Sequence, residues 1–324
     1  MRIASTISAL ALALAALLGL AGNANAQDKT KVIISVSGSG TPSNALGTAL
    51  ASSISQHVRG YSADTDIAAS PEDGVRAVGR GKASLVFVTS DVAYAAGHGE
   101  GAFKDGKIAL RAIAAINPYR MHFIAFEGAG VSRLADLKGK RIAVAQGTAE
   151  APAARLLEAV GLNADKDLRR AILAPADILA AAKDGTLDAV FVMGSVPVPL
   201  ARDLAGIPGR KANLIDSASA VDAVNKKYGP LYTRGAIPAK TYPGQAAAVG
   251  AAESWVILAG GESLSAPVAY NVVKTLFEHK AMLAAMHSDA ANLSLPKQRE
   301  VKLPIAFHPG ALKYFAEKGV RAGK

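Results

Sequence analysis

Short apolar runs that end in turns of glycine, serine and threonine occur in two separate series along this chain. Residues 32–36 and 85–89 are such runs in the first series, and residues 141–145 and 189–192 in the second. Buried parallel strands have this appearance because helices cover both faces of their sheet. The pattern predicts an α/β fold of two similar units.

Helix starts follow most of these turns. Thr41 is a suitable N-cap with Pro42 at the first helical position, and apolar residues then recur every four positions up to about residue 57. Ser70 and Pro71 repeat this start signal. The section after residue 250 has one strand and one long helix but no sheet of its own, so we expect it to return to the first unit.

The predicted organisation is therefore two lobes joined by a hinge, with a ligand cleft between them. Residues 27–117 plus 250–324 form lobe 1, and residues 118–249, including a hinge connection over 228–250, form lobe 2. Residues 111–116 and 121–126 read as two extended runs interrupted by Asn117 and Pro118. We expect the chain to cross between the lobes near Asn117 and near Val249.

The first 26 residues are typical of a secretory signal peptide: Arg2, an apolar run over residues 7–20, and the small-residue site Ala24-Asn25-Ala26. The apolar run is shorter than the roughly 20 residues that span a bilayer, so we expect cleavage near Ala26 and no stable membrane anchor. The chain has no cysteine, which excludes a lipid tether and every thiol mechanism. An exported protein without an anchor is expected in a periplasm.

Composition narrows the class of partner. The net charge is +10, but the Lys and Arg residues are scattered, and an exported protein meets no nucleic acid; we therefore expect no nucleic acid partner. A positive field that attracts small organic anions agrees with the charge, as does plain solubility. About half of the residues are hydrophobic and 5% are aromatic, which suits close packing of helices on a sheet.

The turns after four predicted strands supply candidate ligand contacts. In open α/β sheets, ligands bind at the carboxyl ends of the strands. Hydroxyl groups and free amides at helix N-termini bind anions without a dedicated cation. The candidates are Ser37, Gly38, Ser39, Gly40 and Thr41; Thr89, Ser90 and Asp91; Gln146, Gly147 and Thr148; and Gly194 and Ser195.

Three further candidates lie outside these turns. Asn117 and Tyr119 stand at the predicted crossing, where they would touch a ligand from the hinge, and Arg234 offers a bidentate partner for a carboxylate. Each has a structural alternative, since a surface arginine is commonly solvated. Asp91 either caps its helix or holds a ligand ammonium group, and the second role would favour an amino acid over a plain diacid.

Several motifs resemble the TAXI-type solute-binding proteins of tripartite ATP-independent periplasmic (TRAP) transporters, and the resemblance covers nearly all of the chain after the signal peptide. They are residues 38–41 (GSGT), 90–94 (SDVAY), 237–245 (IPAKTYPGQ) and 304–311 (PIAFHPGA). The last two are the most specific. The chain departs from the family pattern at Pro42-Ser43-Asn44, where a tyrosine pair is usual, and at Lys240, where glycine is usual.

This resemblance implies a type II periplasmic-binding-protein fold that closes on a small organic acid, glutamate-like or C5-dicarboxylate-like. It implies TRAP membrane subunits as partners, a monomeric receptor, and no cofactor or metal. A receptor of the same fold that serves an ABC importer or a membrane sensor kinase is the alternative.

An enzyme is not expected, because hydrolase elbow, zinc-protease and P-loop motifs are missing from the sequence. Gly38, Gly40 and Ser43 make only a partial dinucleotide fingerprint. The six histidines are dispersed, and His122 and His308 are expected to be structural.

Overall fold

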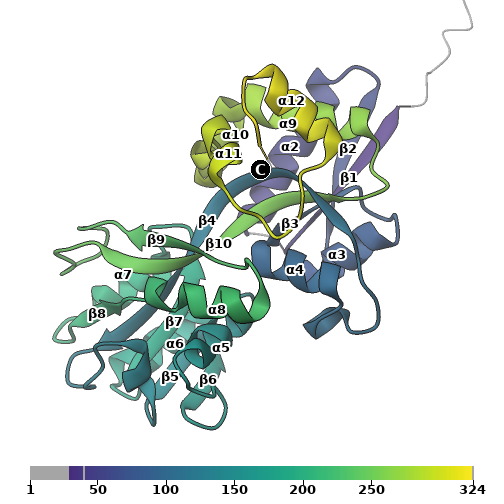
Figure 1. Cartoon of the computed structure of the whole chain (residues 1–324). Helices are drawn as coiled ribbons and strands as arrows, with labels where there is room; N and C mark the ends of the chain where they lie inside the picture. Colours follow the sequence, from purple (N-terminus) through teal and green to yellow (C-terminus); the bar gives the residue numbers. More distant parts are fainter. Residues whose placement is uncertain (1–28, 39–40, 323–324) are drawn as a thin grey trace, which may run out of the picture.

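The structure is a computed structural model that describes residues 29–38 and 41–322. The expected signal peptide, residues 1–26, lies outside the described residues, as do the candidate contacts Ser39 and Gly40. The described chain folds into two lobes (Figure 1), and the α/β class with two lobes is confirmed.

Lobe 1 is built on a mixed sheet. β1 pairs in parallel with β2 and β3, and β10 runs antiparallel between β3 and β4. The C-terminal helices lie on this lobe beside the first helix, α2 (Figure 1). The strands are β1 (Thr30–Val36), β2 (Tyr61–Ile67), β3 (Leu85–Thr89), β4 (Leu110–Phe126) and β10 (Val249–Gly261); the helices are α2 (Pro42–His57), α3 (Pro71–Gly79), α4 (Ser90–His98), α9 (Ala266–Glu278), α10 (Lys280–Met286), α11 (Leu295–Glu300) and α12 (Pro309–Glu317), with short 3-10 turns η1 (Gly101–Phe103) and η4 (Ser288–Asn292).

Lobe 2 continues the same sheet beyond the crossing. β7 pairs antiparallel with β4, and β5 pairs in parallel with β7 and β6. β8 pairs with the end of β4, and β9 with the start of β10. The elements are β5 (Arg141–Ala145), β6 (Arg169–Leu173), β7 (Ala189–Gly194), β8 (Ala212–Ile215), β9 (Thr233–Ile237), α5 (Glu150–Ala159), α6 (Pro175–Lys183), α7 (Pro199–Ala205), α8 (Val221–Tyr228), η2 (Leu134–Leu137) and η3 (Ala218–Ala220).

Two long antiparallel strands join the lobes. β4 is one continuous strand, so the expected break at Asn117 and Pro118 is wrong. Pro118 lies opposite Trp255, and the register of the pair shifts just after Val256. Such an irregularity lets a strand bend and absorbs a residue that has no amide hydrogen to donate. The expected connection over residues 228–250 contains β9 and the start of β10, two strands that the sequence reasoning did not predict there.

Buried apolar side chains form two separate cores. One draws on residues 32–116 and 255–315, and the other on residues 121–252. The crossing between them is polar: Asn117, Glu253 and Ser254 are buried there, and the Arg120 Nε lies 2.8 Å from a Glu253 carboxylate oxygen. Because the apolar cores do not run through the crossing, the hinge carries little hydrophobic burial that would hold the lobes in one arrangement.

Local signals at the helix starts are confirmed. The Thr41 hydroxyl accepts a hydrogen bond from the Asn44 amide at 3.3 Å, and the Ser70 hydroxyl accepts one from Asp73 at 3.1 Å. Each helix has its proline at the expected position. The sequence reasoning missed the outermost strands, β2 and β6, because these carry mostly polar or half-exposed residues and lack a buried apolar run.

The turn between β9 and β10 contains a strained residue. Lys240 has φ of 61°, and it is the one non-glycine residue with positive φ in the described part of the chain. We expect Lys240→Gly to raise the free energy of unfolding by about 0.5–1 kcal/mol, because relief of left-handed strain exceeds the added entropy of glycine in the unfolded chain. Urea denaturation measures the change. The control, Lys226→Gly inside α8, should destabilise the protein; a loss of stability in both variants would contradict the strain argument.

His122 links folding of lobe 2 to pH. Its ring lies within hydrogen-bond distance of the Arg120 carbonyl oxygen and the Tyr242 hydroxyl, both at 2.9 Å, so the expected structural role is confirmed. Burial lowers the pKa of His122 to about 4. Between about pH 4 and pH 6.5, His122 is therefore protonated in the unfolded chain, where its pKa is near 6.5, but neutral in the folded chain.

Stability from this group is therefore complete above about pH 6.5 and is lost as the pH falls towards 4, by a total on the order of 3 kcal/mol. We expect His122→Gln to flatten the pH dependence of the unfolding free energy in that window, measured by urea denaturation at each pH. The exposed His98→Gln is the control. An unchanged slope in His122→Gln would show that another group titrates.

Candidate functional site

A cavity of about 200 Å³ lies where the two lobes face each other. It is formed at the carboxyl ends of β1 and β3, beside the crossing strands, with one side chain from the second lobe. Its walls combine hydroxyl groups with apolar side chains. The lining residues are Ser37, Thr41, Pro42, Ser43, Pro71, Phe87, Val88, Thr89, Tyr119, Thr148 and Val256.

The turn after β1 supplies one wall of this cavity. The Thr41 hydroxyl donates to the Gly38 carbonyl oxygen at 2.9 Å, and the Ser37 amide donates to the Ser43 hydroxyl at 3.2 Å. These bonds close the turn and bring its hydroxyl groups to the N-terminus of α2. The backbone of Gly38 belongs to this turn but does not line the cavity.

Three helices of lobe 1 begin at the cavity. Pro42, Pro71 and Thr89 line it, and they stand at the N-termini of α2, α3 and α4 respectively. Thr89 is only 6% exposed, yet its hydroxyl does not cap α4 and finds no hydrogen-bond partner among the described residues. Aligned backbone dipoles place partial positive charge at each of these helix ends.

The hinge and lobe 2 contribute one hydroxyl each. Tyr119 comes from the crossing strand β4, and burial, together with the charge of Asp289, raises the pKa of its phenol well above the ordinary value. Thr148 comes from the turn between β5 and α5. Gln146 and Gly147 stand in the same turn but are exposed and do not line the cavity; the Gly147 amide donates to a Glu150 carboxylate oxygen at 3.3 Å.

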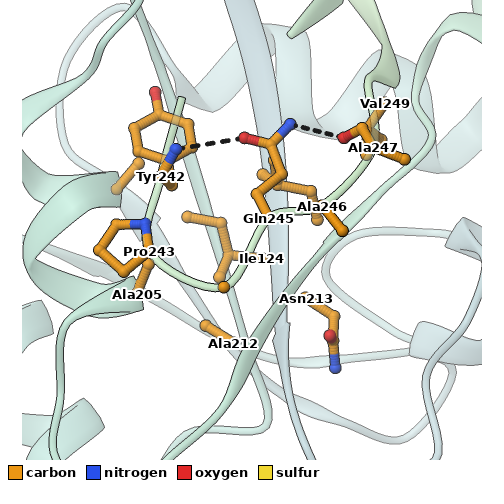
Figure 2. Close-up of a pocket in the computed structure, with 13 residues that line it drawn as sticks. Ile124, Ala205, Ala212, Asn213, Tyr242, Pro243, Gln245, Ala246, Ala247 and Val249 are labelled. Atoms are coloured by element: carbon orange, nitrogen blue, oxygen red, sulfur yellow. Dashed lines mark hydrogen bonds between the residues drawn. The ribbon is translucent and has the colours of Figure 1, made fainter. Parts of the chain in front are cut away.

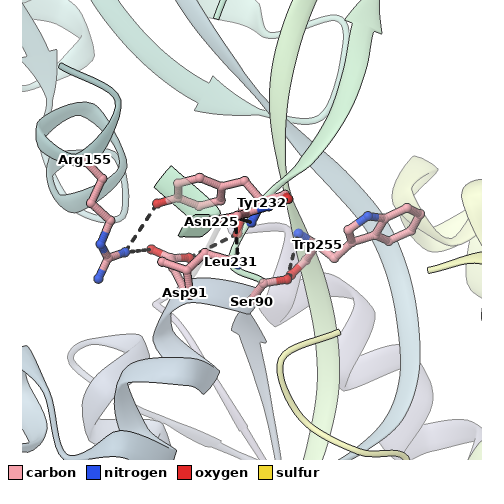
Figure 3. A network of polar contacts seen from close by, with 8 residues as sticks. Ser90, Asp91, Arg155, Asn225, Leu231, Tyr232 and Trp255 are labelled. Atoms are coloured by element: carbon pink, nitrogen blue, oxygen red, sulfur yellow. Dashed lines mark hydrogen bonds and ion pairs between the residues drawn. The ribbon is translucent and has the colours of Figure 1, made fainter. Parts of the chain in front are cut away.

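Asp91 joins the two lobes instead of facing the cavity (Figure 3). Arg155, on α5 of lobe 2, lies 3.2 Å from one Asp91 carboxylate oxygen, and the Ser254 hydroxyl donates to the other at 3.1 Å. Arg155 also donates to the Tyr232 hydroxyl at 3.3 Å. Both partners are largely buried, with side-chain exposures of 5% for Asp91 and 16% for Arg155. Both carboxylate oxygens of Asp91 therefore already have partners within the protein, so Asp91 does not hold a ligand ammonium group here.

Four other candidates belong to the framework around the cavity. The Ser90 hydroxyl donates to the Trp255 carbonyl oxygen at 3.3 Å and accepts from the Trp255 amide at 3.1 Å, which fastens α4 to β10. The Asn117 amide donates to the Ser195 hydroxyl at 2.7 Å and so ties the crossing to the end of β7, beside Gly194. These side chains position the walls and do not line the cavity.

Arg234 has a partner within the protein. Its guanidinium makes two hydrogen bonds to Asp222 on α8, at 2.6 and 3.1 Å, and more than half of its side chain is exposed. Arg234 lies on β9, away from the cavity lining, and its partner is a surface carboxylate.

Sequence reasoning missed the apolar half of the lining. Phe87 and Val88 directly precede Thr89, the last residue of the predicted strand over residues 85–89, and Val256 lies on β10. Pro42 and Pro71 were treated only as helix starts. Pro42, Phe87 and Val88 stand one or two places from a predicted contact, which was a usable signal. Pro71 and Val256 have no predicted contact near them in the sequence.

A second cavity of about 170 Å³ lies within lobe 2 (Figure 2). It is lined by residues of α7, β4 and β8 and by the segment 242–249. Gln245 holds this segment: its side-chain amide donates to the Pro238 and Ala247 carbonyl oxygens at 2.9 and 3.0 Å. All of its lining residues come from lobe 2, so closure of the lobes would not enclose a solute there.

Residues 29–38 and 41–322 contain no cluster of three or more histidine or carboxylate side chains placed to hold a metal ion. None of their helices is both long and apolar enough to span a membrane.

The chain is similar to one protein family and to several solved structures. Residues 35–319 match the profile of the NMT1-like family. The aliphatic sulphonate binding protein SsuA of Escherichia coli superposes with a TM-score of 0.47 at 14% identity, covering 80% of this chain and 79% of that chain. The probable amino-acid ABC transporter extracellular-binding protein ytmK of Bacillus subtilis gives 0.46 at 13% identity, with coverages of 80% and 96%.

The Asp91–Arg155 ion pair makes a prediction about stability. We expect Arg155→Gln to lower the free energy of unfolding by about 3 kcal/mol, because it leaves the Asp91 carboxylate buried without its counter-charge. The double variant Asp91→Asn/Arg155→Gln should recover much of that loss, since two neutral amides can bond in place of the ions. Urea denaturation of the four proteins of this cycle gives the coupling energy, which we expect to exceed about 1 kcal/mol. Additive single effects would mean that the pair does not interact in solution.

Proposed function

This chain belongs to the NMT1-like family, and on that premise we propose that it is a periplasmic receptor that captures a small organic acid between its lobes for delivery to a membrane importer. The observation that carries the proposal is the cavity between the lobes. Thr41 and Thr89 of lobe 1, Tyr119 of the crossing and Thr148 of lobe 2 all line it. A ligand that touches both lobes favours the closed arrangement by its added contacts there.

The chemistry of the lining supports binding over catalysis. Its described residues include no histidine, carboxylate, lysine or arginine that would serve as a general acid or base. The hydroxyl groups present lack an adjacent base that would activate them as nucleophiles. Hydroxyl donors with apolar walls are the usual means by which a receptor orients a small molecule.

The class of membrane partner has two sources of support. The motifs at residues 237–245 and 304–311 resemble the TAXI type and favour a TRAP transporter. The solved structures described above are named for sulphonate binding and for an amino-acid ABC transporter, and the comparisons add nothing for the TRAP subtype. We therefore propose an importer, with an ABC importer as the first partner to test and a TRAP transporter as the second. Uptake driven by ATP hydrolysis rather than by an ion gradient distinguishes them.

The receptor function predicts stabilisation by a solute. A ligand at about one hundred times its dissociation constant should raise the free energy of unfolding by roughly 2.7 kcal/mol. Thermal denaturation of residues 27–324 against amino, keto and hydroxy acids, dicarboxylates and sugars measures this. The chain has one tryptophan, Trp255, which lies in the crossing strand β10, so its fluorescence should respond to the same solutes.

A variant pair locates the response. Thr148→Ala should weaken binding about tenfold, since it removes the lining hydroxyl of lobe 2. Thr186→Ala is the control, because Thr186 precedes β7 at the opposite end of that lobe and bonds only to the Ala181 carbonyl oxygen. A panel with no responding solute would contradict the receptor function, and equal affinities in both variants would contradict the site.

A further inference from the structure

We propose that the ligand of this cavity is a small organic acid with a single negative charge, an apolar body and no ammonium group. The inference rests on the proposed receptor function and names the substrate class of the same site. It differs from the glutamate-like or C5-dicarboxylate-like ligand that the sequence motifs imply.

The first step is the charge of the walls. None of the described residues that line the cavity carries a charge, and the two undescribed residues of the nearby turn are Ser39 and Gly40, which are also uncharged. A ligand group with a full positive charge would lose water here without gaining a counter-charge. An ammonium group is therefore disfavoured.

The second step concerns the ions just outside the walls. Asp91 is paired with Arg155 at 3.2 Å, and Glu253 with Arg120 at 2.8 Å, and each pair has little exposure. Each carboxylate is thus neutralised by an arginine of the protein, and each arginine by a carboxylate. Neither of these two pairs leaves a charge over for a zwitterion such as glutamate, or for the second carboxylate of a diacid. Asp289, whose negative charge acts on Tyr119, does not line the cavity.

Helix N-termini at the cavity can hold one negative charge of the ligand. The N-termini of α2, α3 and α4 meet at the cavity, and each carries partial positive charge. Thr89 is a residue with only 6% exposure that lines the cavity, and its hydroxyl lacks a partner among the described residues, which leaves it available to a ligand atom. A carboxylate accepts hydrogen bonds without donating any, so it matches a set of hydroxyl donors.

The apolar part of the lining indicates the chemistry of the rest of the ligand. Phe87, Val88 and Val256 present an apolar wall, together with the rings of Pro42 and Pro71. A cavity of about 150 Å³ holds benzene, so 200 Å³ suits roughly six to ten non-hydrogen atoms. A branched or aromatic side chain attached to one acid group fits both the size and the wall.

Four probes of nearly equal size test the charge pattern. They are 4-methyl-2-oxopentanoate, a monoanion with a branched body; leucine, which adds an ammonium group; 2-oxoglutarate, which adds a second carboxylate; and glutamate, which adds both. Isothermal titration calorimetry and Trp255 fluorescence measure the dissociation constants. We expect the monoanion to bind at least tenfold more tightly than each of the other three.

The outcomes separate this inference from the receptor function. Tighter binding of leucine, glutamate or 2-oxoglutarate overturns the charge pattern and leaves the receptor function intact. If none of the four probes binds but sugars or other solutes in the wider panel do, the charge pattern is likewise overturned and the receptor function remains. Silence of the whole panel contradicts the receptor function itself.

A variant ties the anion to the helix N-termini. Thr89→Val keeps the shape of the side chain and removes its hydroxyl, so we expect affinity for 4-methyl-2-oxopentanoate to fall at least fivefold. Thr65→Val, on the edge strand β2 of the same lobe, is the matched control and should leave affinity unchanged. Because the Thr89 hydroxyl has no described partner to lose, the thermal midpoint of the unliganded Thr89→Val protein should not fall. Unchanged affinity in Thr89→Val would overturn the placement of the acid group.

Discussion

The antiparallel pairing of β4 with β10 is the constraint on which the rest of this structure depends. Both strands run through both lobes, so one sheet serves two hydrophobic cores. The pairing places Asn117, Pro118 and Tyr119 opposite residues 254–256, between the two cores. Every inter-lobe feature is built around this stretch: the cavity beside Tyr119 and Val256, the Asp91 contact with Ser254, and the Arg120–Glu253 pair.

Charge around the crossing is balanced within the protein. Arg155 reaches across from lobe 2 to Asp91, while Arg120 and Glu253 face each other on the two crossing strands. Such pairs are costly to bury unless they are geometrically well matched and hydrogen-bonded, and Ser254, Tyr232 and Thr233 supply additional bonds. The result is a polar hinge, with its charges paired, beside a cavity whose own walls are neutral.

The sequence predicts the parts of this fold that depend on local chemistry. Residues 85–89 and 141–145 were recognised as strands because they are short, mostly apolar runs, and Thr41 was recognised as a cap because its neighbours repeat a helical pattern. Edge strands such as β2 escape this reasoning because their stability comes from pairing rather than from burial. The continuity of β4 through Pro118 also depends on its partner, β10, which is more than a hundred residues away in the chain.

The sequence likewise predicts one part of the candidate site and not the other. Turn hydroxyls at Ser37, Thr41, Thr89 and Thr148 were chosen correctly as neighbours in space, because carboxyl ends of strands meet at one edge of a sheet. Asp91 and Arg234 were candidate ligand contacts, each with a structural alternative, because their partners, Arg155 and Asp222, could not be identified from spacing. A lone charged residue in a sequence gives no sign of whether the fold already supplies its counter-ion.

The course of the chain through the two lobes bears on how it folds. All core residues of lobe 2 lie within one uninterrupted stretch, 121–252, whereas lobe 1 has core residues as late as Phe315. As the chain is synthesised from its N-terminus, lobe 2 can therefore complete its core once the start of β10 is present, while β1 and β3 still lack the rest of β10 and the C-terminal helices. Lobe 1, whose strands come first in the sequence, is thus the last lobe to complete its core. Strands β1 and β3 must avoid aggregation until α12 has been synthesised.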